Sequence, residues 1–296
     1  MKIDIKKIIR EEIDRFISEG GNVFPESNSF VPKAYMNTII KKAMKEIGLS
    51  KLKYSTVGNT SKKILGDIDL ALDSKELAEH IGYKGNDVGE FFDEINKYLS
   101  KKSRAKKYKV LKGLKQFHTL TELIDNKGNH ANAVIDRKGT VDDTQKGWIQ
   151  MDFFVGDLDW MNKFLTGATK SKYKMAHRNN FIIDIFSQLI FSSKGTDVKK
   201  KFQVNLKNGV ELVDFIKDNK GKRVKLSKKL VIDNPDKITK FLFGRKYSFK
   251  DIDTFEKLYE LFMSNSFKFP NHRNKIIDAF KKSVTSRGYV MPTEIE

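Results

Sequence analysis

Two segments of the sequence alternate between polar and apolar residues, and this alternation limits the possible folds more than any other feature. They read DIDLAL at 67–72 and WIQMDFFV at 148–155. In an extended strand, side chains two residues apart project from the same face of the sheet. Asp67 and Asp69 therefore share the face opposite the apolar residues of the first strand, and Asp152 projects opposite those of the second. The sequence predicts two half-buried strands that present three carboxylates.

The three carboxylates form a candidate metal site. Two carboxylates on one strand face repel each other unless a divalent cation lies between them. The sequence contains no cysteine, so any metal must bind oxygen or imidazole. The five histidines have no spacing typical of a metal cluster, and we interpret His118 and His177 as structural or exposed residues. Asp67, Asp69 and Asp152 would complete an all-oxygen site suited to Mg²⁺ or Mn²⁺.

Other acidic residues compete for the third position in this site. Asp142 and Asp143 lie in a polar stretch, and no apolar neighbours fix them in a strand. Asp157 and Asp159 form a second Asp-x-Asp pair, which we interpret as a turn after the strand. An Asp-x-Asp pair alone is a weak signal, because exposed alternating strands often contain one. We favour Asp152 as the third carboxylate.

A glycine-containing turn precedes the first strand and is suited to binding phosphate. Backbone N–H groups exposed where such a turn leads into a helix suit phosphate oxygens, and nearby hydroxyl and lysine side chains add donors. Gly66 lets a polyphosphate or a metal approach the backbone closely. The candidate nucleotide-binding residues of this segment are Gly58, Asn59, Thr60, Ser61, Lys62, Lys63 and Gly66.

These motifs, in this order, resemble those of the polymerase β-like nucleotidyltransferase superfamily. The resemblance rests on G-N-T-S followed by G-D-I-D-L, with a distant M-D-F-F-V strand. It implies that Gly58 and the next residue bind a triphosphate, and that the three aspartates bind two divalent ions. The family usually has serine at the position of Asn59, and Thr60 or Ser61 could supply the missing hydroxyl.

The resemblance continues downstream, where F-L-T-G-A looks like the aromatic-x-Thr-Gly segment of the same superfamily. It implies that this segment lies beside the sugar of the nucleotide. The implied sugar contacts are Phe164, Leu165, Thr166 and Gly167. The implied contacts to the template or the nascent base pair, from a looser match, are Lys172, Lys174 and Arg178.

The remaining periodic patterns predict an α+β protein with two domains. The expected first domain, residues 1–176, has a mixed β-sheet flanked by helices and preceded by N-terminal helices, and the resemblance implies that it is a polymerase β-type nucleotidyltransferase palm. The expected second domain, residues 177–296, is mostly helical and contains a buried helix at 181–193. Further helical patterns occur at 3–17, 32–47 and 88–99, and extended patterns at 53–57 and 116–136.

The chain carries an excess of positive charge. Its formal net charge is +19 at pH 7 and its pI is about 9.7, for a mass of 34.2 kDa. Such an excess repels itself unless a polyanion offsets it, which favours nucleic acid or nucleotide phosphate as a partner. Basic residues gather at 101–115 and at 221–229, where we expect a basic loop. The alternative is a lysine-rich composition that reflects AT-rich coding, with lysines spread over a solvated surface.

Nothing in the sequence predicts a membrane partner. No apolar run is long enough to cross a bilayer, and the opening MKIDIKKIIREE has charges where a signal peptide needs an apolar run. We therefore expect a cytoplasmic protein. Its composition and size suit a bacterial protein or one made in a phage-infected host cell.

These features favour one function and leave two alternatives open. The leading hypothesis is transfer of a nucleoside monophosphate from an NTP or dNTP to a hydroxyl of a nucleic acid, with release of pyrophosphate. The second is nucleotidyl transfer to a protein or a small molecule, as in toxin and antibiotic-modifying members of the superfamily. The third is a catalytically silent nucleic-acid-binding protein that retains the fold.

Overall fold

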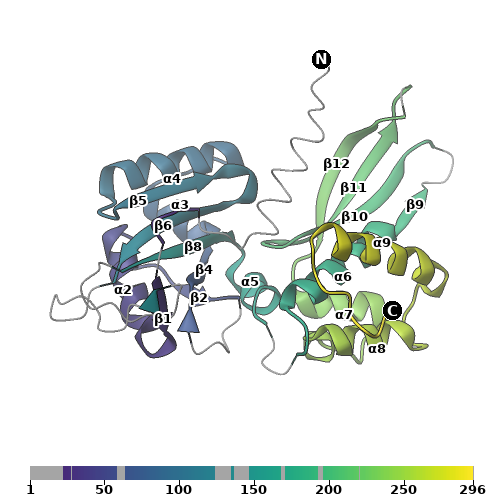
Figure 1. The fold of residues 1–296 in the computed structure, drawn as a ribbon. Helices are drawn as coiled ribbons and strands as arrows, with labels where there is room; N and C mark the ends of the chain where they lie inside the picture. Colours follow the sequence, from purple (N-terminus) through teal and green to yellow (C-terminus); the bar gives the residue numbers. More distant parts are fainter. Residues whose placement is uncertain are drawn as a thin grey trace, which may run out of the picture. The chain divides into compact units, whose positions relative to one another are not determined.

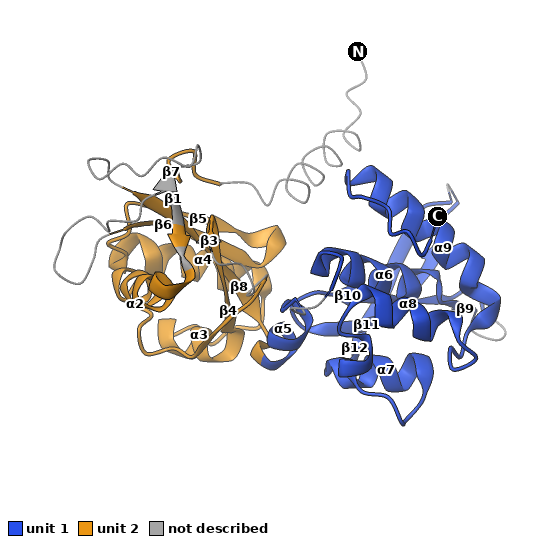
Figure 2. Cartoon of the chain, turned by 60° about the horizontal axis from the view of Figure 1, so that its bottom comes forward, with its two compact units in different colours: residues 1–20, 159–296 blue, residues 21–158 orange. Residues whose placement is uncertain are grey.

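The computed structural model describes residues 23–27, 29–58, 64–123, 135–136, 147–167, 171–192, 196–219 and 221–295. The chain forms two compact units (Figure 2). Unit 2 contains the described residues up to Leu158, and unit 1 contains those from Asp159 onward. The helix expected at 3–17 lies outside the described residues.

A five-stranded mixed sheet forms the centre of unit 2 (Figure 1). In spatial order its strands are β2 (Tyr54–Thr56), β4 (Asp67–Asp73), β8 (Trp148–Gly156), β6 (Gln116–Glu122) and β5 (Lys107–Leu111). β4 and β8 are parallel, whereas the other neighbouring strands are antiparallel. The two strands predicted from alternation are thus neighbours in the interior of a mixed sheet.

Helices pack against the apolar face of this sheet. Ile40 of α2 and Phe92 of α4 belong to one buried core with Leu70 of β4 and Phe153 of β8. The helices of unit 2 are α2 (Met36–Glu46), α3 (Ser74–Ile81) and α4 (Val88–Lys102), with short 3-10 helices at Lys33–Tyr35 and Lys112–Leu114. A separate small sheet contains β3 (Ile64–Leu65), β1 (Ser29–Pro32) and β7 (Ile135–Asp136).

Local capping signals define the helices that follow β4. Asp73, the last residue of β4, is the N-cap of α3, and its side chain accepts hydrogen bonds from the first turn. α3 ends at Gly82, whose φ of 78° lies in the left-handed region that favours glycine. Asp87 caps α4 in the same way as Asp73 caps α3. The strand that carries Asp67 and Asp69 is therefore followed by a capped helix with no loop between them.

Unit 1 combines helices with a four-stranded antiparallel sheet, which corrects the expectation of a mostly helical domain. The sheet order is β12 (Arg223–Ile232), β11 (Gly209–Lys217), β10 (Lys199–Asn205) and β9 (Ile190–Ser192). The helices are α5 (Leu158–Phe164), α6 (Met175–Gln188), α7 (Pro235–Phe243), α8 (Phe255–Met263) and α9 (Arg273–Ser286), with 3-10 helices at Phe249–Ile252 and Pro270–His272. The expected basic loop at 221–229 is largely strand, because its residues pair with β11.

Aromatic packing joins the helices of unit 1. Phe181 of α6 is fully buried, with its ring centroid 4.9 Å from those of Phe262 and Phe280 and 5.6 Å from that of Phe255. These partners lie on α8 and α9. The buried helix predicted from the sequence is present, but it ends at Gln188. Ile190, which was expected to face inward, begins β9 and is 38% exposed.

The units separate earlier in the chain than the predicted boundary at residue 176, which lies within the first turn of α6. The division falls instead at the start of α5. The Trp160 indole of α5 donates a 3.1 Å hydrogen bond to the backbone carbonyl of Leu206, and the Arg178 guanidinium of α6 donates one to the carbonyl of Phe164. These contacts tie α5 to the later elements of the chain.

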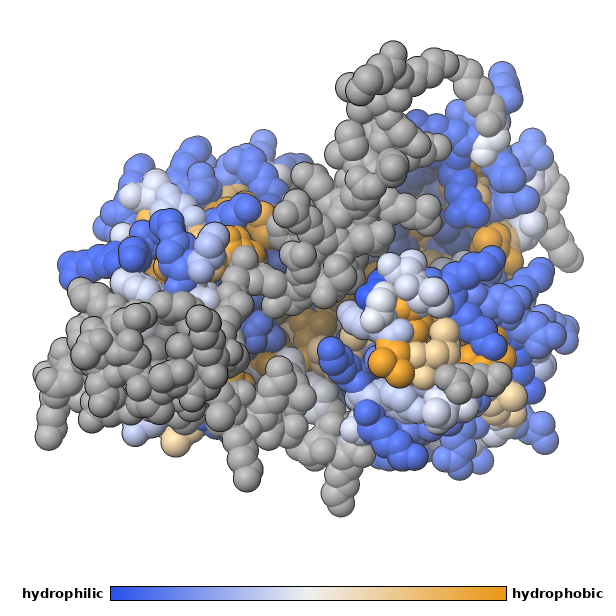
Figure 3. Space-filling view, in the orientation of Figure 1, coloured by the Kyte–Doolittle hydropathy of each residue, from blue (hydrophilic) through white to orange (hydrophobic). Residues whose placement is uncertain are grey.

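Hydrophilic residues make up most of the visible surface of the described residues, and hydrophobic residues form smaller areas (Figure 3). Some large apolar side chains remain exposed on β12, including Val224, Leu226 and Leu230. Among the described helices, none combines the length and the apolar character that crossing a lipid bilayer requires.

Candidate metal and nucleotide site

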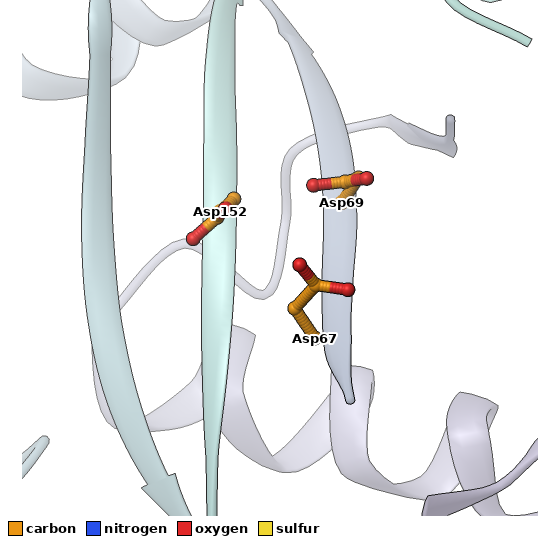
Figure 4. Close-up of side chains that lie close together, drawn as sticks. All are labelled: Asp67, Asp69 and Asp152. Atoms are coloured by element: carbon orange, nitrogen blue, oxygen red, sulfur yellow. The ribbon is translucent and has the colours of Figure 1, made fainter. Parts of the chain in front are cut away.

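The three predicted aspartates come together on the polar face of the unit 2 sheet (Figure 4). The parallel register pairs Asp69 of β4 with Asp152 of β8, and it pairs Asp67 with Gln150. One carboxylate oxygen from each aspartate lies within 4.8 Å of the others, and all three side chains are half-buried. Strands far apart in the sequence thus present one carboxylate cluster that remains accessible to a ligand.

The donor set of this cluster fits a hard divalent cation. Three carboxylates this close repel one another, and a cation between them offsets the repulsion. Ligand oxygens on opposite sides of an octahedral Mg²⁺ lie about 4.2 Å apart, because each Mg–O bond is about 2.1 Å long. The triad oxygens, all within 4.8 Å of one another, need only small side-chain rotations to reach that geometry. All-oxygen ligands are those that Mg²⁺ and Mn²⁺ prefer.

Two side chains orient the carboxylate of Asp152. The Nδ1 atom of His118 lies 2.6 Å from Asp152 Oδ1, and Gln150 Nε2 donates to the same oxygen at 2.8 Å. His118 is only 2% exposed and Gln150 only 1%, so neither can swing away into solvent. Buried partners of this kind fix the direction of a metal ligand.

The hydrogen bonds of His118 assign the tautomer of its ring. The Nε2 atom of His118 lies 3.2 Å from the amide nitrogen of Gln116, which can only donate. Nε2 therefore accepts, and Nδ1 carries the hydrogen that is donated to Asp152. The sequence predicts a structural or exposed role for His118. The structure shows it buried, which agrees with a structural role, and in direct contact with the third carboxylate through the antiparallel register that pairs it with Asp152.

The glycine turn lies directly against the second aspartate. Gly58 has a φ of +79°, and a Cβ atom added there would lie 2.4 Å from Asp69 Oδ2. The backbone N–H of Val57 donates a 3.0 Å hydrogen bond to the carbonyl of Asp69. Only glycine meets both the conformational and the steric demand at this position. The turn and the carboxylate cluster are therefore parts of one local structure.

The remaining residues of the predicted phosphate-binding segment are only partly described. Gly66 is half-buried between β3 and β4, next to Asp67. The predicted contacts of Asn59, Thr60, Ser61, Lys62 and Lys63 lie outside the described residues, and they stay predictions.

Two residues implied to contact the nucleotide or the template are buried in unit 1. The ring of Phe164 is fully buried and stacks on Trp160 with a centroid distance of 5.1 Å, so the side chain packs in the core. Arg178 is 1% exposed and donates hydrogen bonds to the side chain of Asn179 and to the carbonyls of Phe164 and Asp253. Burial lowers the pKa of Arg178 to about 10. In this structure the Arg178 guanidinium therefore binds backbone carbonyls of unit 1, and it is not exposed for contact with a template.

Thr166 and Gly167 occupy a more open position in unit 1. They line a pocket of about 510 Å³ together with Lys163 and Phe249. The hydroxyl oxygen of Thr166 is buried and has no hydrogen-bond partner among the described atoms. Such an unpaired hydroxyl is costly, so a ligand or a water that reached it would lower the free energy of the folded protein. Their predicted contact with a sugar stays a prediction.

No family model matches the sequence, and a search of curated proteins finds no match either. Among solved structures, two complexes of Leishmania infantum polymerase beta are similar to this chain. The ternary P/T complex has 10% identity and a TM-score of 0.34, over 78% of this chain and 83% of that chain. The ternary gap complex has 10% identity and a TM-score of 0.33, over 80% and 79%. TM-scores this low support no shared activity, so the chemistry must follow from the carboxylate cluster itself.

Proposed function

We propose that this chain is a metal-dependent nucleotidyltransferase that moves a nucleoside monophosphate from a nucleoside triphosphate to a hydroxyl group. The observation that carries the proposal is the carboxylate cluster, in which one oxygen each of Asp67, Asp69 and Asp152 lie within 4.8 Å of one another. The turn at Gly58, in contact range of Asp69, supports it, as does the resemblance of these motifs to the polymerase β-like superfamily. We propose Mg²⁺ or Mn²⁺ as the metal. A nucleic acid is the proposed acceptor, because the net charge is +19.

In the proposed reaction, the acceptor hydroxyl oxygen forms a bond to the α-phosphorus of the triphosphate. The bond from that phosphorus to the oxygen that bridges to the β-phosphate breaks, and pyrophosphate leaves. Divalent ions, when bound, stabilise the charge that develops on these oxygens. The three aspartates would hold the ions, and we assign Asp152 to accept the hydroxyl proton. His118 and Gln150 keep its carboxylate in a fixed orientation.

We assign the triphosphate to the glycine turn. Backbone N–H groups of a glycine turn suit phosphate oxygens, and Lys62 and Lys63 would neutralise the charge of the β- and γ-phosphates. Thr166 and Gly167 are the proposed contacts to the sugar. Both assignments rest on the sequence motifs and on their resemblance to the superfamily.

Labelled nucleoside triphosphates test the proposal directly. The protein would be incubated with each labelled NTP or dNTP, with Mg²⁺ or Mn²⁺, and with DNA, RNA or protein acceptors. Asp69→Asn removes one ligand charge, and we expect it to reduce transfer by about a thousand-fold, because a metal ion contributes several kcal/mol to the transition state. Asp93→Asn is the matched control. It removes an exposed carboxylate whose ion pair with Lys112 lies at the surface, where such pairs contribute little.

The acceptor that becomes labelled selects among the hypotheses. Label on DNA or RNA supports nucleic-acid transfer, and label on a protein or small molecule alone selects the second alternative. Folded wild-type protein that labels no acceptor with either metal, or an Asp69→Asn variant as active as Asp93→Asn, would contradict the proposal. Nucleic-acid binding without transfer would then favour the catalytically silent alternative.

A further inference from the structure

Positive charge is concentrated in the sheet of unit 1. Residues 199–232 contain eleven lysines and arginines against three acidic residues, a difference of eight out of a net charge of +19 for the whole chain. This segment covers β10, β11 and β12. It is a small part of the chain, so a uniformly solvated lysine-rich surface does not explain its share of the charge.

The register of the strands gathers these charges on one face. Residues paired across an antiparallel sheet project from the same side. Val213 pairs with Lys201 and Lys228, while Phe215 pairs with Lys199 and Lys225. Lys217 also pairs with Arg223. We call this side of the sheet the basic face, and its cations are Lys199, Lys201, Lys217, Arg223, Lys225 and Lys228.

Carboxylates compensate little of this charge. Glu211 is the acidic residue whose position in β11 places it on the basic face, and it forms a 2.6 Å ion pair with Lys228. The other five cations have no carboxylate partner among the described ion pairs of the chain. Four of those five side chains are exposed, and Lys201 is half-buried. The basic face therefore presents uncompensated charge to solvent.

Two cations are crowded over a single aromatic ring. The Lys201 ammonium lies 5.9 Å and the Arg223 guanidinium carbon 5.1 Å from the ring centroid of Phe215, which is 2% exposed. Burial and the charge of Arg223 lower the pKa of Lys201. Like charges held together in this way repel, and an anion bound above them would remove the repulsion.

Protection of a sheet edge explains only part of the pattern. Lysines on an edge strand prevent unwanted pairing with other chains, and β12 is an edge strand of this sheet. That reason covers Arg223 and Lys225. It does not cover Lys199, Lys201 or Lys217, because β10 and β11 lie inside the sheet with a strand on each side.

We propose that the basic face binds the phosphodiester backbone of a nucleic acid through ion pairs, without reading its base sequence. The partner is a polyanion, because the cations are spread over three adjacent strands rather than gathered around one small anion. β11 and β12 also extend beyond the helices of unit 1, which leaves room for a long ligand (Figure 1). Contacts of this kind contribute affinity and not chemistry, and they do not require the carboxylate cluster.

Salt-dependent binding tests this surface. A variant with three neutralised basic-face residues would carry Lys217→Gln, Arg223→Gln and Lys225→Gln. A control variant with the same change in net charge would carry Lys51→Gln, Lys275→Gln and Lys282→Gln, all at exposed positions that are not part of this sheet. Binding of labelled single-stranded and duplex DNA would be measured at several NaCl concentrations in EDTA. Circular dichroism would confirm that both variants are folded.

Each phosphate contact contributes about 0.9 to the slope of log Kd against log salt for duplex DNA, and about 0.7 for a single strand. We expect the basic-face variant to lower the slope by about 3 or about 2, respectively, and to raise Kd about tenfold or more, while the control retains the wild-type slope. Equal slopes in all three proteins would overturn the proposal, as would equal losses in the two variants. Wild-type binding to anionic vesicles but not to DNA would also overturn it.

The outcome is independent of the proposed enzymatic activity. EDTA removes divalent metal, and the variant Asp69→Asn should bind DNA with the wild-type slope. A failure of nucleotidyl transfer therefore leaves the basic-face result unchanged. Loss of DNA binding in Asp69→Asn would show that the carboxylate cluster, and not the basic face, is responsible for the affinity.

Discussion

Replacing Gly58 with alanine tests whether the glycine turn and the carboxylate cluster act as one site. Gly58 has a φ of +79°, and alanine in this region costs about 1–2 kcal/mol in backbone strain. The new Cβ would also lie 2.4 Å from Asp69 Oδ2. An ordinary contact is about 3.5 Å, so the carboxylate must move by about 1 Å.

Gly82→Ala is a control for the backbone strain. Gly82 has a φ of +78°, and a Cβ there would meet nothing within 4 Å. The two substitutions should therefore lower the free energy of unfolding by similar amounts, about 1–2 kcal/mol. Only Gly58→Ala should also displace a metal ligand. A misplacement of about 1 Å near the reacting atoms reduces the rate by about 100-fold.

Denaturant unfolding, Mn²⁺ titration followed by electron paramagnetic resonance, and the nucleotidyl-transfer rate would be measured for both variants. We expect equal destabilisation, with weaker Mn²⁺ binding and slower transfer only in Gly58→Ala. Mn²⁺ affinity and transfer rate that are the same in the two variants would refute the reasoning, because the clash with Asp69 would then have no consequence for the site.

Substitutions at three other residues each examine one side chain. His118→Ala should weaken Mn²⁺ binding by about 10- to 100-fold. His118→Asn should retain most of the Mn²⁺ affinity, because its amide can still donate to Asp152. Equal losses of affinity in the two variants would argue against a positioning role for His118. Thr166→Val should change the free energy of unfolding by less than about 1 kcal/mol and raise KM for the nucleotide. An unchanged KM would remove Thr166 from the site. Burial raises the pKa of Asp184 from 3.8 to about 6. Above pH 6 the carboxylate is ionised and its burial destabilises the folded state, whereas below pH 3.8 it is protonated in both the folded and the unfolded state and this cost disappears. Asp184→Asn should stabilise the protein above pH 6 and lose that advantage below pH 3.8, whereas an effect equal at both pH values in denaturant unfolding would contradict burial as the cause.

The strand that carries the first two aspartates could be predicted because burial alternates along the first half of β4. Ile68 and Leu70 alternate with Asp67 and Asp69, and burial of the apolar residues forces the aspartates onto the opposite face. A third carboxylate on a similar strand can complete a metal site only if its strand lies next to the first one. The parallel pairing of Asp69 with Asp152 realises that arrangement.

Other features depend on contacts that no local pattern contains. β12 has residues exposed on both faces, so burial imposes no alternation on GKRVKLSKK, and the sequence pattern alone predicts a loop there. The contact of His118 with Asp152 depends on the register of β6 against β8. The boundary between the units depends on hydrogen bonds such as that from Trp160 to Leu206, which join distant parts of the chain.

The central claim is that three aspartates from two strands bind the same divalent cations. Crystals grown with Mn²⁺ and a non-hydrolysable nucleoside triphosphate, measured for anomalous scattering, would test it most directly. We expect an anomalous peak about 2.1 Å from an oxygen of each of Asp67, Asp69 and Asp152. A nucleotide-bound crystal in which no Mn²⁺ contacts more than one of these side chains would contradict the claim.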